Sequence, residues 1–163
     1  MRPDYIEIGT IVNTHGVRGE MKLAVRDVEP ALLRPVKTLY IDGSAYPVAS
    51  ARVHKDFLLV TFPSVTDLDA ALRFKGKAVS IRREDVRLPE GVYFPAELIG
   101  LSAVDAESGA ALGTLMQVLP YPAHDVYVIR GEKEFMVPAV PAFIQEINLE
   151  KETIQIHVWE GLL

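Results

Sequence analysis

Alternating apolar and polar residues predict strands along most of the first half of the chain. In residues 20–26, Met21, Leu23 and Val25 share one face and polar or charged residues occupy most of the other. A period of two is typical of a strand with one buried face. Asp42-Gly43 is a turn signal, so the strand predicted after it is expected to pair with the strand predicted before it. The other predicted strands are 5–12, 36–41, its partner 46–53, 57–62 and 78–81.

One short helix is predicted among these strands. Thr66 and Asp69 match a weak capping box, in which an acid follows a threonine by three residues. Leu68, Ala71 and Leu72 then share one face of the expected helix. About six strands and one helix in fewer than ninety residues predict a small closed β barrel.

The second half of the chain has the same character. Gly113 marks a possible bulge, and Ile154, Ile156 and Val158 fall on one face of the last strand. Residues 140–144 are too short for more than a helical turn. These patterns predict a second small barrel or curled sheet. Its predicted strands are 98–104, 112–119, 125–130, 134–137 and 153–158.

A short segment with two adjacent aromatic residues separates the halves. Pro89 and Gly91 interrupt regular structure, and Tyr93 and Phe94 follow. We therefore predict a first domain over 1–88, a linker over 89–97 and a second domain over 98–163. Two rings in a linker can fill the seam between domains or form a recognition element. Both hold if one ring packs inward and the other faces out.

Charge is distributed unevenly between the two halves. Residues 1–88 carry fourteen basic and eleven acidic residues, a net charge of +3, whereas residues 89–163 carry three and eleven, a net charge of −8. Such asymmetry suggests partners of opposite sign for the two halves, although an acidic balance also keeps proteins in solution. The chain lacks cysteine, a signal-peptide pattern and an apolar run long enough to span a bilayer. We expect a soluble cytoplasmic protein.

The predicted loop at 13–19 combines glycines with basic residues. His15 and Arg18 in the loop, and Lys22 after it, could contact phosphates, because glycine permits close backbone approach. The segment lacks the Gly-Lys-Ser/Thr ending of a phosphate-binding P-loop. Taken alone, the residues favour an ordinary tight turn.

The sequence contains no recognisable catalytic or metal-binding motif. Its four histidines lie in separate segments, and none has a second ligand at metal-binding spacing. No nucleophile elbow or dinucleotide fingerprint is present. We therefore favour a binding protein without catalytic residues, metal or cofactor. The four histidines are His15, His54, His124 and His157.

Four further motifs follow one another along the chain. They are Ile8-Gly9-Thr10-Ile11 leading into Thr14–Glu20, Asp67–Leu72 running to Lys75-Gly76-Lys77, Tyr93-Phe94 before Glu97-Leu98-Ile99-Gly100, and Val137-Pro138 through Phe143-Ile144 to Glu160–Leu163. In this order they resemble the ribosome maturation factor RimM family. The resemblance covers nearly the whole chain. One departure is Phe94, which stands where the family usually has a second tyrosine and which lacks the hydroxyl of that residue as a hydrogen-bonding group.

This resemblance implies a mostly β protein with two barrels and no catalysis. The first barrel is like that of elongation factors and some reductases, and the second is similar to the PRC barrel. The resemblance also implies assistance to folding of the small-subunit head and to rRNA processing. The implied partners are the nineteenth small-subunit ribosomal protein, at Tyr93 and Phe94, and the immature subunit with its rRNA. We expect a monomer. Competing hypotheses are a flavin-linked reductase and a PRC-type adaptor at a membrane complex.

Overall fold

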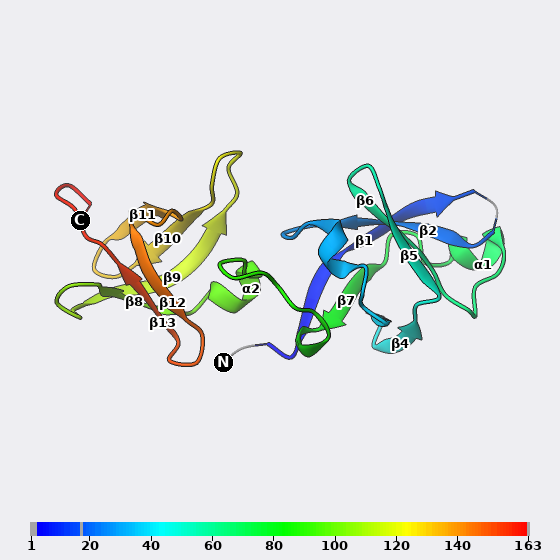
Figure 1. Ribbon diagram of the computed structural model, residues 1–163, viewed down its shortest axis with the longest axis horizontal. Coiled ribbons are helices and arrows are strands. Elements are labelled where there is room, and N and C mark those ends of the chain that lie inside the picture. The colour runs from blue at the N-terminus through cyan, green and yellow to red at the C-terminus, as the bar shows by residue number, and fades with distance from the viewer. Residues whose placement is uncertain (1–2, 17, 163) are drawn as a thin grey trace. The chain divides into compact units, whose positions relative to one another are not determined.

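The computed structural model describes residues 3–16 and 18–162, which form two compact units at residues 3–92 and 93–162. Each unit is built on its own curled β-sheet (Figure 1). The mostly β class and the two curled sheets confirm the predicted fold. Residue 17 of the predicted loop lies outside the described residues. So do residues 1 and 163, which are the outer bounds of the two predicted domains.

The first unit contains a largely antiparallel sheet in the order β4-β3-β7-β1-β2-β6-β5. One α-helix, α1 (Leu68–Leu72), and two 3-10 turns, η1 (Pro30–Leu33) and η2 (Arg83–Asp85), connect its strands. Its strands are β1 (Tyr5–His15), β2 (Glu20–Val25), β3 (Thr38–Ile41), β4 (Ser44–Pro47), β5 (Ser50–His54), β6 (Phe57–Thr61) and β7 (Ala78–Arg82).

The two edge strands of this sheet are joined by a two-residue link, which brings the two edges of the curled sheet together. The N–H of Val48 donates to the carbonyl of Lys37, and the N–H of Ala49 donates to the carbonyl of Thr61, each at 2.8 Å. The link therefore hydrogen-bonds to the chain beside β4 on one side and beside β5 on the other.

The interior of the first barrel follows the predicted alternation. Met21 and Leu23 on β2 are fully buried, as is Ile11 on the neighbouring strand. A Cβ atom on Gly9 would lie 2.0 Å from the carbonyl oxygen of Ala24. Glycine is therefore needed here so that β1 can approach β2 closely.

Three predictions for the first half differ from the structure. β1 continues to His15, so residues 13–15 of the predicted loop are strand. The single strand predicted over 46–53 is two strands, because β4 pairs with β3 whereas β5 pairs with β6. The helix is capped by Asp67, whose carboxylate accepts from the N–H of Ala70 at 2.8 Å, and Leu72 points to solvent with 42% exposure.

The second unit contains a sheet in the order β11-β10-β9-β8-β13-β12, in which β8 and β13 are parallel. The bulge predicted near Gly113 is confirmed by a register shift between β8 and β9. Its elements are α2 (Pro95–Leu98), β8 (Ser102–Asp105), β9 (Ala111–Leu119), β10 (Val126–Arg130), β11 (Glu134–Pro138), β12 (Ile144–Asn148) and β13 (Thr153–Ile156).

The core of the second unit confirms part of the predicted pattern. Ile154 and Ile156 are fully buried in it. Val158 was predicted to share their face but lies beyond the end of β13 with 37% exposure. The strand predicted from residue 98 begins only at Ser102, because Pro95 starts a short helix first. Strand β12 was not predicted.

Candidate functional site

The aromatic segment forms the entry to helix α2. Phe94 is the residue before the helix, and Pro95 occupies its first position, where proline is favoured. The N–H of Phe94 donates to the carboxylate of Glu97 at 3.2 Å, while the N–H of Glu97 donates to the carbonyl of Phe94 at 2.9 Å. This reciprocal pairing fixes the path of the chain as it enters the helix.

The two adjacent rings have different environments. Phe94 is only 1% exposed, so it is a buried residue rather than an open contact ring. Tyr93 is partly buried and packs against the core of the second unit. Burial raises the pKa of Tyr127 to about 12, and the nearby Asp125 and Tyr93 add to the shift. Tyr93 therefore keeps some accessible surface and is held near Tyr127.

The predicted basic residues do not all lie in a loop. His15 is the last residue of β1, Lys22 lies within β2, and Arg18 is exposed in the connection between these strands. Gly19 in this connection has a φ of +86°, and a Cβ there would lie 2.6 Å from the carbonyl oxygen of Val65. The connection therefore packs closely against the chain preceding α1, which leaves no room for a side chain at Gly19.

A cluster of charged residues and histidines forms on the polar side of β1, β2, β6 and β5. The rings of His15 and His54 have centroids 5.2 Å apart. Arg52 donates two hydrogen bonds to the carboxylate of Glu20, at 3.1 and 3.0 Å. We call this surface the histidine face, and its members are His15, Glu20, Lys22, Arg52 and His54.

An aromatic ring lies beside Lys22, the cation of the histidine face that is not hydrogen-bonded to Glu20. The ammonium group of Lys22 lies 4.8 Å from the ring centroid of Phe57 on β6. Phe57 pairs directly with His54 in the sheet. Attraction between a cation and an aromatic face holds such an ammonium group in place without neutralising its charge.

The electrostatics of the histidine face show an excess of positive charge. Desolvation lowers the pKa of His54, and the charges of His15, Lys55, Arg52 and Lys22 lower it further. The pKa of Glu20 is lowered chiefly by its hydrogen bond to Arg52. Glu20 is the single carboxylate in this set of five residues. The face therefore suits a phosphate or another anion that would balance its cations.

Sequence reasoning found His15 and Lys22 but missed Arg52 and His54. The two missed residues lie on β5, which is separated from β2 by β6 in the sheet. The available signal was alternation in the predicted strand, which places residues 52 and 54 on the same face. It did not indicate that this face meets the end of β1.

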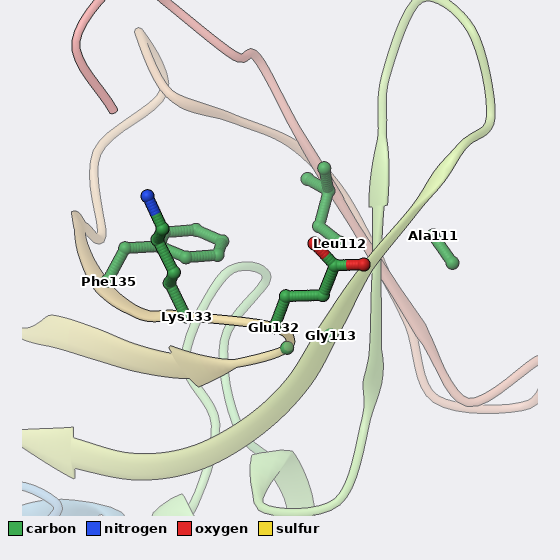
Figure 2. A pocket seen from close by; sticks show the side chains of 7 residues that line it. Ala111, Leu112, Gly113, Glu132, Lys133 and Phe135 are labelled. Atoms are coloured by element: carbon green, nitrogen blue, oxygen red, sulfur yellow. The ribbon is translucent and has the colours of Figure 1, made fainter. Parts of the chain in front are cut away.

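A hollow of about 640 Å³ opens in the second unit near the β10–β11 turn (Figure 2). In Figure 2 the carboxylate of Glu132 lies on the side of Leu112, and Lys133 lies on the side of the ring of Phe135. This lining provides apolar surface with one charge of each sign, but no nucleophile paired with a base. Its residues are Ala111, Leu112, Gly113, Gly131, Glu132, Lys133 and Phe135.

Within residues 3–16 and 18–162, no group of three or more histidine, cysteine, aspartate or glutamate side chains is placed to hold a metal ion. No helix in the same ranges is both long and apolar enough to cross a membrane.

The fold and these surfaces define a mostly β protein built of two curled sheets. A family model described as the RimM N-terminal domain matches residues 6–86. A second, described as the RimM PRC barrel domain, matches residues 95–162. Together they span most of the chain, and the chain therefore belongs to the RimM family.

Similar proteins extend along the full length of the chain. A ribosome maturation factor RimM from Lacticaseibacillus casei is 37% identical over 168 residues, covering 99% of this chain and 97% of the relative. One from Bacillus cereus is 38% identical over 169 residues, covering 98% of each. A crystal structure of a 16S ribosomal RNA processing protein RimM from Pseudomonas aeruginosa is 25% identical, covers 97% and 99% of the two chains, and has a TM-score of 0.47.

Proposed function

We propose that this protein is a maturation factor for the small ribosomal subunit. It assists assembly of the subunit head and processing of the rRNA by binding, without covalent catalysis, in the cytoplasm and as a monomer. The observation that carries the proposal is the match to both RimM domains, in order, together with full-length relatives named ribosome maturation factor.

The proposed protein partner is the nineteenth small-subunit ribosomal protein, with the aromatic segment as part of the contact. Tyr93 is the ring with accessible surface, so we assign it the direct contact. Phe94 is buried and acts by holding the segment at the start of α2. Residues 93–162 carry ten acidic and three basic residues, a net charge of −7. Such a unit attracts a basic ribosomal protein and speeds its association at low salt.

The proposed rRNA contact is the histidine face together with Arg18. Lys22, His15 and His54 offer donors that Glu20 does not neutralise, because the carboxylate of Glu20 is engaged by Arg52. Arg18 is exposed beside them in the chain. Contacts of basic side chains with phosphates position a protein on RNA and weaken as salt rises. In this proposal the first unit binds rRNA, and the second unit binds the ribosomal protein.

The test is binding of the purified protein to the purified nineteenth small-subunit ribosomal protein, by titration calorimetry at low and moderate salt. The wild type is expected to bind, and less tightly as salt rises. Tyr93→Ala is expected to weaken binding roughly tenfold. Tyr121→Ala is a matched control, because Tyr121 is also a tyrosine of the second unit and is 54% exposed. Circular dichroism checks each fold, and equal affinity for all three proteins would refute the assignment of Tyr93.

A further inference from the structure

The outer surface of strands β9, β10 and β11 carries apolar side chains where a one-sided sheet would carry polar ones. These strands are neighbours in the second unit (Figure 1). Register defines which side chains lie together, because residues directly opposite on paired strands share a face. Met136 lies opposite Val128, which lies opposite Gln117. In the next row on this face, Pro138 lies opposite Val126, which lies opposite Leu119.

The intervening rows establish which face is the outer one. Tyr127 and Val137 belong to the core of the unit, and they form one row with Val118, which packs against that core. Ile129 and Phe135 form another core row. Successive residues of a strand point to opposite faces. The rows containing Met136 and Pro138 therefore face away from the core.

A register shift in β9 adds a second methionine to this region. The pairing of β9 with β10 skips Met116, which lies between Leu115 and Gln117. Met116 is 44% exposed and Met136 is 54% exposed. We call this surface the methionine face, and it consists of the exposed Met116 and Met136, the half-buried Leu119, Val126 and Pro138, and the buried Val128.

Single exposed apolar residues are common and need no explanation, but Met116 and Met136 lie among further apolar side chains that are half-buried or buried. An antiparallel sheet that packs one face on a core normally presents polar residues on the other. Methionine is flexible and polarisable, and it is used at surfaces that adapt to a protein partner. Two exposed methionines within such an apolar surface form a candidate interaction site.

The charges around the methionine face indicate the chemistry of its partner. The third row holds Arg130 and Glu134, which form an ion pair at 3.0 Å and so cancel each other. Glu132 and Asp125 are exposed at opposite ends of β10. The whole unit has a net charge of −7 over residues 93–162. This charge repels nucleic acid, and it also opposes a second copy of a chain whose net charge is −5.

We propose that the methionine face is a docking surface for a basic protein segment that presents apolar side chains. The inference rests on the proposed function, because the basic ribosomal protein supplies such a segment. It adds a contact that is separate from the aromatic segment, since Tyr93 packs on the core whereas the methionine face lies on the opposite side of the same strands. Apolar side chains of the partner cover the methionines, and its cations meet the acidic surroundings.

The experiment compares Met116→Glu/Met136→Glu with the wild type and with Leu72→Glu. Leu72 is a suitable control because it is an exposed apolar residue, 42% accessible, on α1 of the other unit. Affinity for the purified nineteenth small-subunit ribosomal protein is measured by fluorescence anisotropy. Co-sedimentation measures binding to immature small subunits, and sedimentation equilibrium measures self-association of the free protein. The double variant is expected to bind at least roughly tenfold more weakly, with Leu72→Glu unchanged and all three proteins monomeric and folded.

Three outcomes would overturn the inference. If the double variant bound the ribosomal protein within twofold of the wild type, the methionine face would not be the docking surface, and the proposed function would stand. If the wild type self-associated and the double variant did not, the occupant would be a second copy. If the wild type neither bound the ribosomal protein nor co-sedimented with immature subunits, both the inference and the proposed function would fail.

Discussion

The buried carboxylate of Glu97 accepts a hydrogen bond from the N–H of Phe94 and so anchors the aromatic segment to helix α2. Glu97 is 4% exposed, and every buried side-chain nitrogen or oxygen among the described residues has a hydrogen-bond partner. The segment proposed to bind a ribosomal protein is therefore positioned by an internal polar contact, as well as by packing. Loss of this contact would disturb both stability and the position of Tyr93.

Replacement of Glu97 by alanine should lower the free energy of unfolding by about 1–3 kcal/mol, because a buried N–H loses its acceptor. Urea denaturation followed by circular dichroism measures this loss. Glu150→Ala is the control, since Glu150 is an exposed acid of the same unit, and its stability should stay within about 0.5 kcal/mol of the wild type. Equal stabilities of the two variants would show that the contact does not stabilise the entry to α2.

Gly9 should be far less tolerant of alanine than Gly16. A Cβ at Gly9 meets the backbone carbonyl of Ala24 at 2.0 Å, whereas a Cβ at Gly16 meets no atom within 4 Å. Gly9→Ala must therefore separate β1 from β2, at a cost of roughly 1–3 kcal/mol or more. Gly16→Ala costs only about 1 kcal/mol for its positive φ of +72°. Thermal unfolding of the two variants measures the difference, and a reversed order would contradict the pairing of β1 with β2.

Removal of a cation from the histidine face should weaken binding to rRNA in a salt-dependent way. Lys22→Gln is expected to reduce the slope of log affinity against log salt by about 0.7–0.9, as for the loss of one phosphate contact. Lys37→Gln is a matched control, because Lys37 is an exposed lysine of the same unit outside the histidine face. Filter binding to an rRNA fragment from the subunit head, at several salt concentrations, measures the slope. Unchanged slopes for Lys22→Gln would place the rRNA contact elsewhere.

The lowered pKa of His54 predicts a loss of stability in mild acid. Its pKa lies below the ordinary value of 6.5 in the folded protein, so near that pH the unfolded chain binds more protons. Folding stability therefore decreases as pH falls below about 6.5 and towards the folded-state pKa. His54→Gln should reduce the difference in melting temperature between pH 7.5 and pH 5.5. A difference as large as in the wild type would show that His54 does not contribute to it.

The raised pKa of Tyr127 predicts a late ionisation in alkali. Its value of about 12 in the folded state, against 10.0 ordinarily, means that the folded protein retains a proton that the unfolded chain releases. The stability contributed by Tyr127 is therefore present below about pH 10 and is lost as pH rises towards 12. Absorbance at 295 nm follows the titration. Tyr127→Phe should remove the late component, whereas Tyr121→Phe should leave it in place.

The fold was predictable where a strand has one buried face and a regular register. β2 is such a strand, with Met21 and Leu23 inside. β12 was missed because a register shift lies between Ile144 and Glu146, which places two polar residues in succession and breaks the alternation. The strand after α2 was predicted to begin at Leu98, the last residue of the helix, because apolar residues run from Leu98 to Leu101 with only Gly100 among them.

The candidate site was predictable only in part. His15 and Lys22 stood out because they are close in sequence to two glycines. Arg52 and His54 did not, because their proximity to β1 depends on the order of four strands in a curled sheet. Phe94 was expected to offer a ring for recognition or packing, and its burial could be learned only from the fold. Local patterns therefore indicated the chemistry of the site, whereas its membership depended on long-range pairing.

The most direct test of the account is co-sedimentation of the purified wild-type protein with ribosomal particles in a sucrose gradient. The account predicts that the protein migrates with immature small subunits at moderate salt, dissociates at high salt, and does not migrate with large subunits. A protein that remained at the top of the gradient in the presence of immature small subunits, at low as well as moderate salt, would contradict it.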